Sequence, residues 1–304
     1  MVRTTSEAPC WKKTWCEQPG PCIGYRLKRY CGLSVTPDSS RSSAPQPTRL
    51  SGISRCSSGN SWRGFKGNFR IIRGDYRVEV NLLAPHNLWL RCSARGEVGQ
   101  YLRCTLLYGH HFKVEGQADP SNTRLSLEIP AGECRRLELE PQADGLVAGF
   151  SCERPGVYSL LAEYDLGVYS HLKDGSYLRG RVSREDVTRI VHFRHFAKTI
   201  VTIGDQGNWP GSYGMPLEII PLRLDRDEVD ILVQAGGRPL VNNQVFAHCN
   251  GRAVSRFTRT GPDGKVSLGV FQGEWMFIVR LETEGEKDID ARIQGATLTL
   301  NVNT

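Results

Sequence analysis

The strongest constraint on the fold is a period-two alternation of apolar and polar residues that recurs from about residue 76 to the end of the chain. It is clearest over residues 125–129, 137–140 and 296–302. A period of two places successive side chains on opposite faces of a strand. The Pro-Ala-Gly sequence at 130–132 predicts a turn between the first two of these strands. Short strands separated by turns favour an all-β fold of antiparallel β-sandwiches over a helical or βαβ fold.

A stretch rich in glycine and proline divides the strand-rich part of the chain. Residues 206–216 include Gly207, Pro210 and Gly211 and predict a linker. The turns and strands beyond it are typical of small prealbumin-like or carboxypeptidase-regulatory sandwiches. We therefore expect two consecutive sandwiches, immunoglobulin-like or prealbumin-like, over residues 76–205 and 217–304. One short helix is expected over residues 184–190, after a capping Ser183.

The first 75 residues differ from the rest in charge and texture. Residues 1–74 hold 13 Lys and Arg against 3 Asp and Glu, whereas the other 230 residues hold 26 against 29. No apolar period survives in this leader, which predicts disorder or a mis-assigned start, with a basic tail for anionic polymers or membranes as the alternative. Since the folded part has no basic excess, we expect no nucleic-acid partner for it.

Export and cysteine chemistry give weaker signals. No apolar run approaches the roughly 18 residues of a membrane helix, and the N-terminus has no recognisable signal peptide. The five cysteines of residues 1–75 contain no Cys-Xaa-Xaa-Cys pair, so they match no common zinc module. Cys134 and Cys152 flank successive strand-like runs and are a candidate disulfide, with buried free thiols as the alternative.

Several short motifs occur in a characteristic order over residues 84–304. They are the Ala-Pro-His-Asn-Leu-Trp-Leu segment at 84–90, Gly109-His110, the Pro-Gly-Val-Tyr strand at 155–158, Ala197-Lys198 and the Pro-Leu-Glu-Ile junction at 216–219. This order resembles a bacterial domain-of-unknown-function family that is often described as the periplasmic component of ABC-type cobalt transport or nickel uptake. The resemblance implies an exported, periplasmic protein that assists a membrane transporter. The leader departs from the family pattern, in which a cleaved signal precedes the first motif.

Histidines are the natural ligands for the metals that this resemblance suggests. Imidazole suits Ni, Co, Cu and Zn, which usually require two to four converging ligands. His86 and His110 match motif positions and fall on strands expected to be neighbours, and His171 is the third candidate. We therefore expect a divalent transition metal, Ni or Co, with Zn or Cu as alternatives. His192 and His195 are three apart on an expected strand, so they face opposite ways and are not candidates.

Exposed aromatic residues support an alternative function. Trp209 and Tyr213 in the linker are candidates for contact with a glycan or a protein partner, as in a surface or periplasmic adhesion module. Trp275 lies in a strongly apolar run and is expected in the core. No nucleophile elbow, Walker loop or His-Glu-Xaa-Xaa-His motif is present. The expected function is therefore non-enzymatic: metal binding in nickel or cobalt uptake, or adhesion.

Overall fold

The computed structural model describes residues 86–130, 132–204, 209–252 and 254–302, together with the backbone of two earlier strands. Those two, β1 (Arg70–Arg73) and β2 (Tyr76–Glu79), pair with each other in antiparallel fashion and belong to a separate compact unit. Apart from β1, the leader predicted over residues 1–75 lies outside the described residues. All the elements from β3 onward belong to one compact unit.

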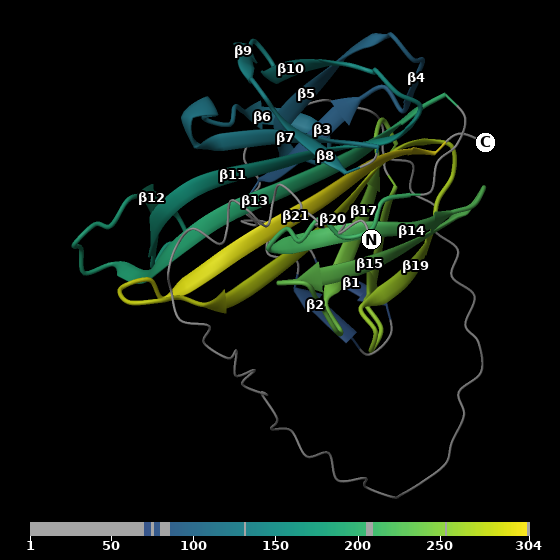
Figure 1. Ribbon diagram of the computed structural model, residues 1–304. Coiled ribbons are helices and arrows are strands. Elements are labelled where there is room, and N and C mark those ends of the chain that lie inside the picture. Colours follow the sequence, from purple (N-terminus) through teal and green to yellow (C-terminus); the bar gives the residue numbers. More distant parts are fainter. Residues whose placement is uncertain are drawn as a thin grey trace, which may run out of the picture. The chain divides into compact units, whose positions relative to one another are not determined.

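Three sheets make up this unit (Figure 1). The first is five-stranded and contains β3 (Asn87–Cys92), β5 (Tyr101–His110), β10 (Gly145–Ser151) and β9 (Glu140–Gln142), with β6 (Lys113–Gly116) on β5. The second is ten-stranded. Eight of its strands follow the order β18 (Ser255–Arg259), β17 (Gln244–Cys249), β20 (Gly273–Glu284), β21 (Ala291–Val302), β13 (Val187–Ile203), β11 (Gly156–Leu172), β7 (Thr123–Ile129) and β8 (Glu133–Leu137). The other two are β12 (Tyr177–Arg179), which pairs with β11, and β4 (Arg95–Gly96), which pairs with β13. The third is four-stranded: β14 (Leu217–Leu224), β15 (Glu228–Ala235), β16 (Arg238–Pro239) and β19 (Lys265–Gly269). A 3₁₀ turn, η1 (Pro120–Asn122), precedes β7.

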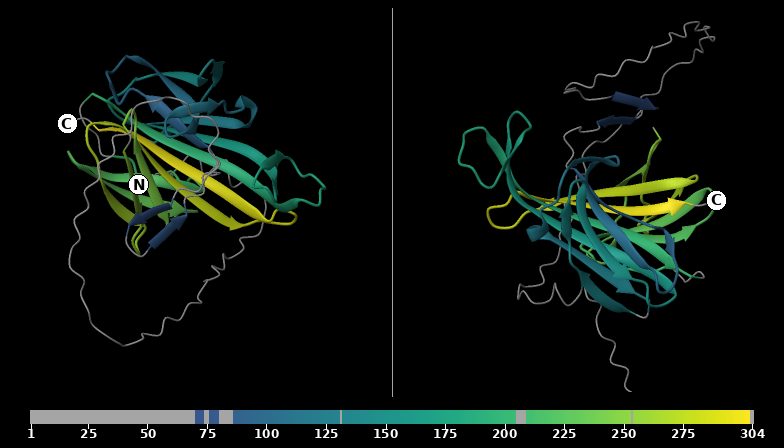
Figure 2. Two further views of the ribbon diagram at one scale, coloured as in Figure 1. Left: turned by 180° about the vertical axis from the view of Figure 1, so that it is seen from behind. Right: turned by 90° about the horizontal axis from the view of Figure 1, so that it is seen from above.

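The ten-stranded sheet is the central layer, and each of the other sheets covers one of its faces (Figures 1 and 2). On β13, Ala197 and Val201 pack in the core under the five-stranded sheet, whereas Phe196 and Ile200 pack in the core under the four-stranded sheet. This alternation follows the pleat of a strand that is buried on both sides. The all-β, sandwich-type fold expected from the alternation is thus confirmed.

The central sheet crosses the stretch 206–216 because its strands come from both sides of it. β13 precedes that stretch and β21 follows it, and the two strands pair in parallel from Val191 with Ala291 to Thr199 with Thr299. The apolar run in β20 is continuous because this strand, too, is buried on both faces. Trp275 and Phe277 face the core under the four-stranded sheet, and Met276 faces Trp89 and Leu107 of the five-stranded sheet. Trp275 is fully buried, as expected.

Two local expectations are wrong. No helix forms over residues 184–190, because β13 begins at Val187 and its β-branched residues pair with β11. Cys134 and Cys152 are not a disulfide, since all five described cysteines are free thiols. Cys134 lies opposite Glu128 on β8, whereas Cys152 is fully buried in the core under the five-stranded sheet.

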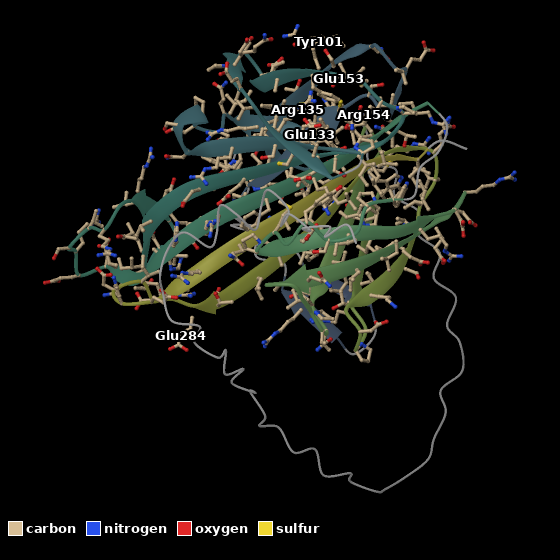
Figure 3. The ribbon with its side chains drawn as sticks, in the orientation of Figure 1. Tyr101, Glu133, Arg135, Glu153, Arg154 and Glu284 are labelled. Carbon is tan, nitrogen blue, oxygen red and sulfur yellow. The ribbon has the colours of Figure 1, made fainter. Side chains whose placement is uncertain are left out.

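A surface ion cluster links the central sheet to the five-stranded sheet. The guanidinium of Arg135 on β8 donates two hydrogen bonds, of 2.8 and 3.1 Å, to Glu153 beyond β10 and a third, of 2.6 Å, to Glu133 (Figure 3). Bidentate arginine–carboxylate pairs of this kind fix geometry as well as charge. The cluster therefore ties the edge strand of the central sheet to the five-stranded sheet.

Among the described residues, no helix is long and apolar enough to span a membrane.

Candidate metal centre

The candidate metal centre lies where β3, the first strand of the five-stranded sheet, begins and β5, the second, ends. Asn87 of β3 pairs with Gly109 of β5, so His86 and His110 lie side by side at this edge. β5 then turns into β6, where a register shift between Tyr108 and Gly109 brings Glu115 to the same edge. Gly109 is required here, because a Cβ on it would meet the Lys113 carbonyl oxygen at 2.0 Å.

Three side chains converge at this edge. The ligand atoms of His86, His110 and Glu115 all lie within 4.8 Å of one another. The two imidazole rings are 4.3 Å apart between centroids, and His110 Nδ1 donates to Glu115 Oε2 at 2.5 Å. Lys113 Nζ lies 3.0 Å from the other oxygen of Glu115. Since the three side chains are 29–37% exposed, a hydrated ion can reach them.

The electrostatics of the centre favour the forms that bind metal. Hydrogen bonds from His110 and Lys113 lower the pKa of Glu115 to about 2, so this carboxylate is ionised at neutral pH. Partial burial, with the nearby His110 and Arg280, lowers the pKa of His86. A neutral imidazole and an ionised carboxylate are the states in which these side chains act as ligands. An incoming ion would replace the hydrogen bond between His110 Nδ1 and Glu115 Oε2.

The third predicted ligand lies elsewhere. His171 is on β11, where its ring lies tilted against that of Tyr177, with centroids 4.7 Å apart, and its Nδ1 lies 3.0 Å from Thr188 Oγ1. It is not part of the converging group, whose third member is Glu115. His192 and His195 lie on strand β13 and face opposite ways, as expected: His192 contacts Asp165, whereas His195 is buried.

The two aromatic residues proposed for partner contact are engaged within the chain. Trp209 and Tyr213 are half-buried and pack against the core under the four-stranded sheet. The Tyr213 hydroxyl donates to Ser159 Oγ at 3.0 Å, and its ring lies 5.0 Å from Lys198 Nζ. Their position gives no particular support to the adhesion alternative.

Comparison with known proteins identifies the family. The model of the domain of unknown function DUF4198 matches residues 83–283, which is more than half of the chain and includes all three residues of the candidate metal centre. The chain belongs to this family. No curated protein matches this DUF4198 chain.

Solved structures resemble the DUF4198 chain only remotely. A tetra-tandem repeat from the extending region of a large adhesion protein is 13% identical over 72% of this chain, with a TM-score of 0.21, and the chain spans 50% of that structure's length. A two-domain fibronectin type III segment of chicken tenascin is 12% identical over 71% of this chain and 99% of its own length, with a TM-score of 0.20. Likenesses this distant add nothing to what the strands of this DUF4198 domain themselves establish.

The structure adds residues to the site that sequence reasoning missed. Glu115 has only a weak sequence signal, since it follows His110 by five residues across a short hairpin. His248 has none, because it comes from β17 in the central sheet, and yet its ring lies 4.0 Å from that of His111. The contact depends on a strained turn, in which His111 (φ 48°) and Phe112 (φ 67°) both adopt left-handed backbone.

That turn directs consecutive histidines in two directions. A two-residue hairpin loop with positive φ at both positions normally carries Asn-Gly, so His-Phe is costly there and must be held by its surroundings. Phe112 packs edge-on against Trp89 at 6.1 Å, which anchors one residue of the loop. His110 is then directed to the metal centre and His111 to His248. Burial first, then His111 and Arg280, lower the pKa of His248 to about 4.

Proposed function

We propose that this DUF4198 protein binds a divalent transition metal through His86, His110 and Glu115. The observation that carries the proposal is the convergence of two imidazoles and one carboxylate within 4.8 Å, at a partly exposed sheet edge. Two nitrogens and one oxygen suit Ni²⁺, Co²⁺ and Zn²⁺. Residues in left-handed backbone collect at functional sites, and the neighbouring turn is consistent with that tendency.

The composition of the centre suits uptake and release better than permanent storage. Three protein ligands leave coordination positions open, as in metal sites that exchange water or substrate, whereas structural sites usually use four. We therefore propose capture of the ion and its transfer to a membrane transporter, without catalysis by this chain. The family resemblance supports nickel or cobalt as the cargo and a location outside the cytoplasm.

Titration calorimetry of Ni²⁺, Co²⁺ and Zn²⁺ into the full chain tests the proposal. We expect one site of micromolar affinity or tighter, weakened at least roughly tenfold in both His110→Ala and Glu115→Gln, because each removes one of three ligands. His171→Ala is the matched control, since it removes an imidazole outside the converging group. Binding that is absent, or that falls equally in the His171 variant, would overturn the proposal.

A further inference from the structure

A hollow at the end of β17 adjoins the candidate metal centre. It favours an anion, whereas the candidate metal centre favours a cation. It is lined by His111, His248, Gly251, Arg252 and Ser255, among others, and no described residue that lines it is acidic. The guanidinium of Arg252 lies over the ring of Phe271 at 4.6 Å, which holds it at the hollow. Within the described ranges, no carboxylate forms an ion pair with Arg252. We call this feature the arginine hollow.

Hydrogen-bond donors gather around the arginine hollow. The rings of His111 and His248 lie 4.0 Å apart, and each neutral imidazole offers one N–H. His248 Nδ1 lies 2.6 Å from Ser255 Oγ, so one ring nitrogen of His248 is oriented by a hydroxyl. Gly251, at φ 69° in the turn that follows β17, leaves open space, since a Cβ on it would meet nothing within 4 Å.

The charge of the arginine hollow selects an anion. Arg252 lines it. Burial first, and then charged neighbours that include the partly buried Arg280, lower the pKa of both His111 and His248. A second metal cation would be repelled by these guanidinium groups, whereas a carboxylate would accept hydrogen bonds from Arg252, Ser255 and an imidazole. Arginine binds planar carboxylates, like phosphates, in a bidentate manner.

The distance to the metal centre links the two features. His110 of the centre and His111 of the arginine hollow are consecutive, and their rings lie 6.5 Å apart between centroids. The two features therefore share the His110–His111 turn. The metal centre supplies three ligands and leaves positions open, which a chelating ligand with several carboxylates would fill with one group while another occupies the hollow.

We infer that the cargo of this protein is a complex between the metal and a small carboxylate chelator, with a free carboxylate of the chelator held at Arg252. This inference rests on the proposed function, because the metal of the complex is the ion bound by His86, His110 and Glu115. It deepens that function by naming the chemical class of the cargo.

Calorimetry on the full chain with three probes tests the inference: Ni²⁺ alone, citrate alone, and Ni²⁺ premixed with equimolar citrate, in a buffer free of other carboxylates. If the protein takes only the free ion, citrate competes with it and the apparent affinity for nickel falls. If the protein takes the complex, the premixed probe binds at least as tightly as Ni²⁺ alone.

Two arginine variants make the test specific. In Arg252→Gln we expect the affinity for the premixed probe, relative to that for Ni²⁺ alone, to fall roughly tenfold, through loss of a charge-assisted contact. Arg256→Gln is the matched control, since Arg256 does not line the hollow. His248→Gln gives a second reading, and thermal unfolding of each variant verifies that it folds.

The outcomes separate the inference from the function on which it rests. Binding of Ni²⁺ alone with citrate acting only as a competitor, unchanged by Arg252→Gln, would overturn the inference and leave the metal centre standing. Citrate that binds through Arg252 without any gain from nickel would also overturn it, because the hollow would then take free carboxylates. Failure of Ni²⁺ and of the premixed probe to bind would overturn the proposed function itself.

Discussion

The ammonium group of Lys198 lies 2.5 Å from the carboxylate of Glu218, and the two side chains are only 2% and 1% exposed. Lys198 is on β13 of the central sheet and Glu218 on β14 of the four-stranded sheet, so the pair connects two layers. Glu218 also accepts hydrogen bonds from the Ser212 hydroxyl and from the backbone N–H groups of Tyr213 and Gly214. The segment before β14 is thus folded around one carboxylate.

Removal of the lysine should be strongly destabilising. In Lys198→Met the Glu218 carboxylate stays buried without its counter-ion, which costs about 3–5 kcal/mol of unfolding free energy. Urea unfolding measures the loss. The control is Lys265→Met, whose ion pair with Asp263 is exposed and is expected to contribute less than about 1 kcal/mol. Equal effects of the two variants would contradict the role of the buried pair.

Acid should weaken the fold through His195. Burial first, then Arg280 and His86, lower the pKa of this histidine from 6.5 to about 3. Because the unfolded chain takes up a proton at a higher pH than the folded chain, the stability is fully present above pH 6.5 and is lost as the pH falls from there toward 3. Over the middle of that window, protonation of this group lowers the free energy of unfolding by about 1.4 kcal/mol for each unit by which the pH falls.

Urea unfolding at several pH values checks this expectation. His195→Gln should reduce the slope between about pH 6 and pH 4, and His171→Gln, which alters a partly exposed ring, is the control. If the slope is the same in both variants, His195 is not its source. Side-chain NMR of His195 should show a neutral ring throughout the same range.

The core under the five-stranded sheet contains a pair of thiols suited to cross-linking. Cys92 and Cys104 lie directly opposite each other on antiparallel strands β3 and β5. Opposed Cα atoms on such strands are about 4.5–5.5 Å apart, which falls within the range that a disulfide bridges. We predict that oxidised glutathione joins Cys92 to Cys104 through a mixed disulfide, with release of two glutathione thiols.

Peptide mass mapping without reduction identifies the product. The reaction should be slow at neutral pH, because burial raises the pKa of Cys92 to about 12 and keeps the thiolate scarce. Cys92→Ser should remove the cross-link, while Cys134→Ser should leave it in place. A bond between Cys134 and Cys152 instead would show that the register of this core is different.

The hairpin of the metal centre should depend on a residue that binds no metal. In Gly109→Ala the new methyl group collides with the Lys113 carbonyl, so β6 must shift and Glu115 with it. We expect a loss of about 1–3 kcal/mol in stability and at least a roughly tenfold loss in nickel affinity. Gly211→Ala, where a Cβ meets nothing within 4 Å, is the control for both measurements. Unchanged affinity in Gly109→Ala would separate the hairpin from the metal centre.

The sequence by itself determined the local structure of this protein. Alternation over 125–129 and 296–302 identifies strands because pleating is a property of each strand alone, and strands occur there. Residues 137–140 instead span the end of β8 and the start of β9. His86 and His110 could be paired from their motifs, since adjacent strands bring them to one edge. The prediction of a short helix over 184–190 was wrong, because a capping pattern is weaker than the pairing between β13 and β11.

Tertiary structure alone decided how these strands share their cores and which residues complete the site. The parallel pairing of β13 with β21 joins residues about a hundred positions apart, and no local pattern specifies it. Glu115 reaches the candidate metal centre through a register shift, and His248 reaches His111 through the packing of one sheet on another. Period and spacing encode the face on which a side chain lies, whereas its partner across a layer depends on the packing of the whole core.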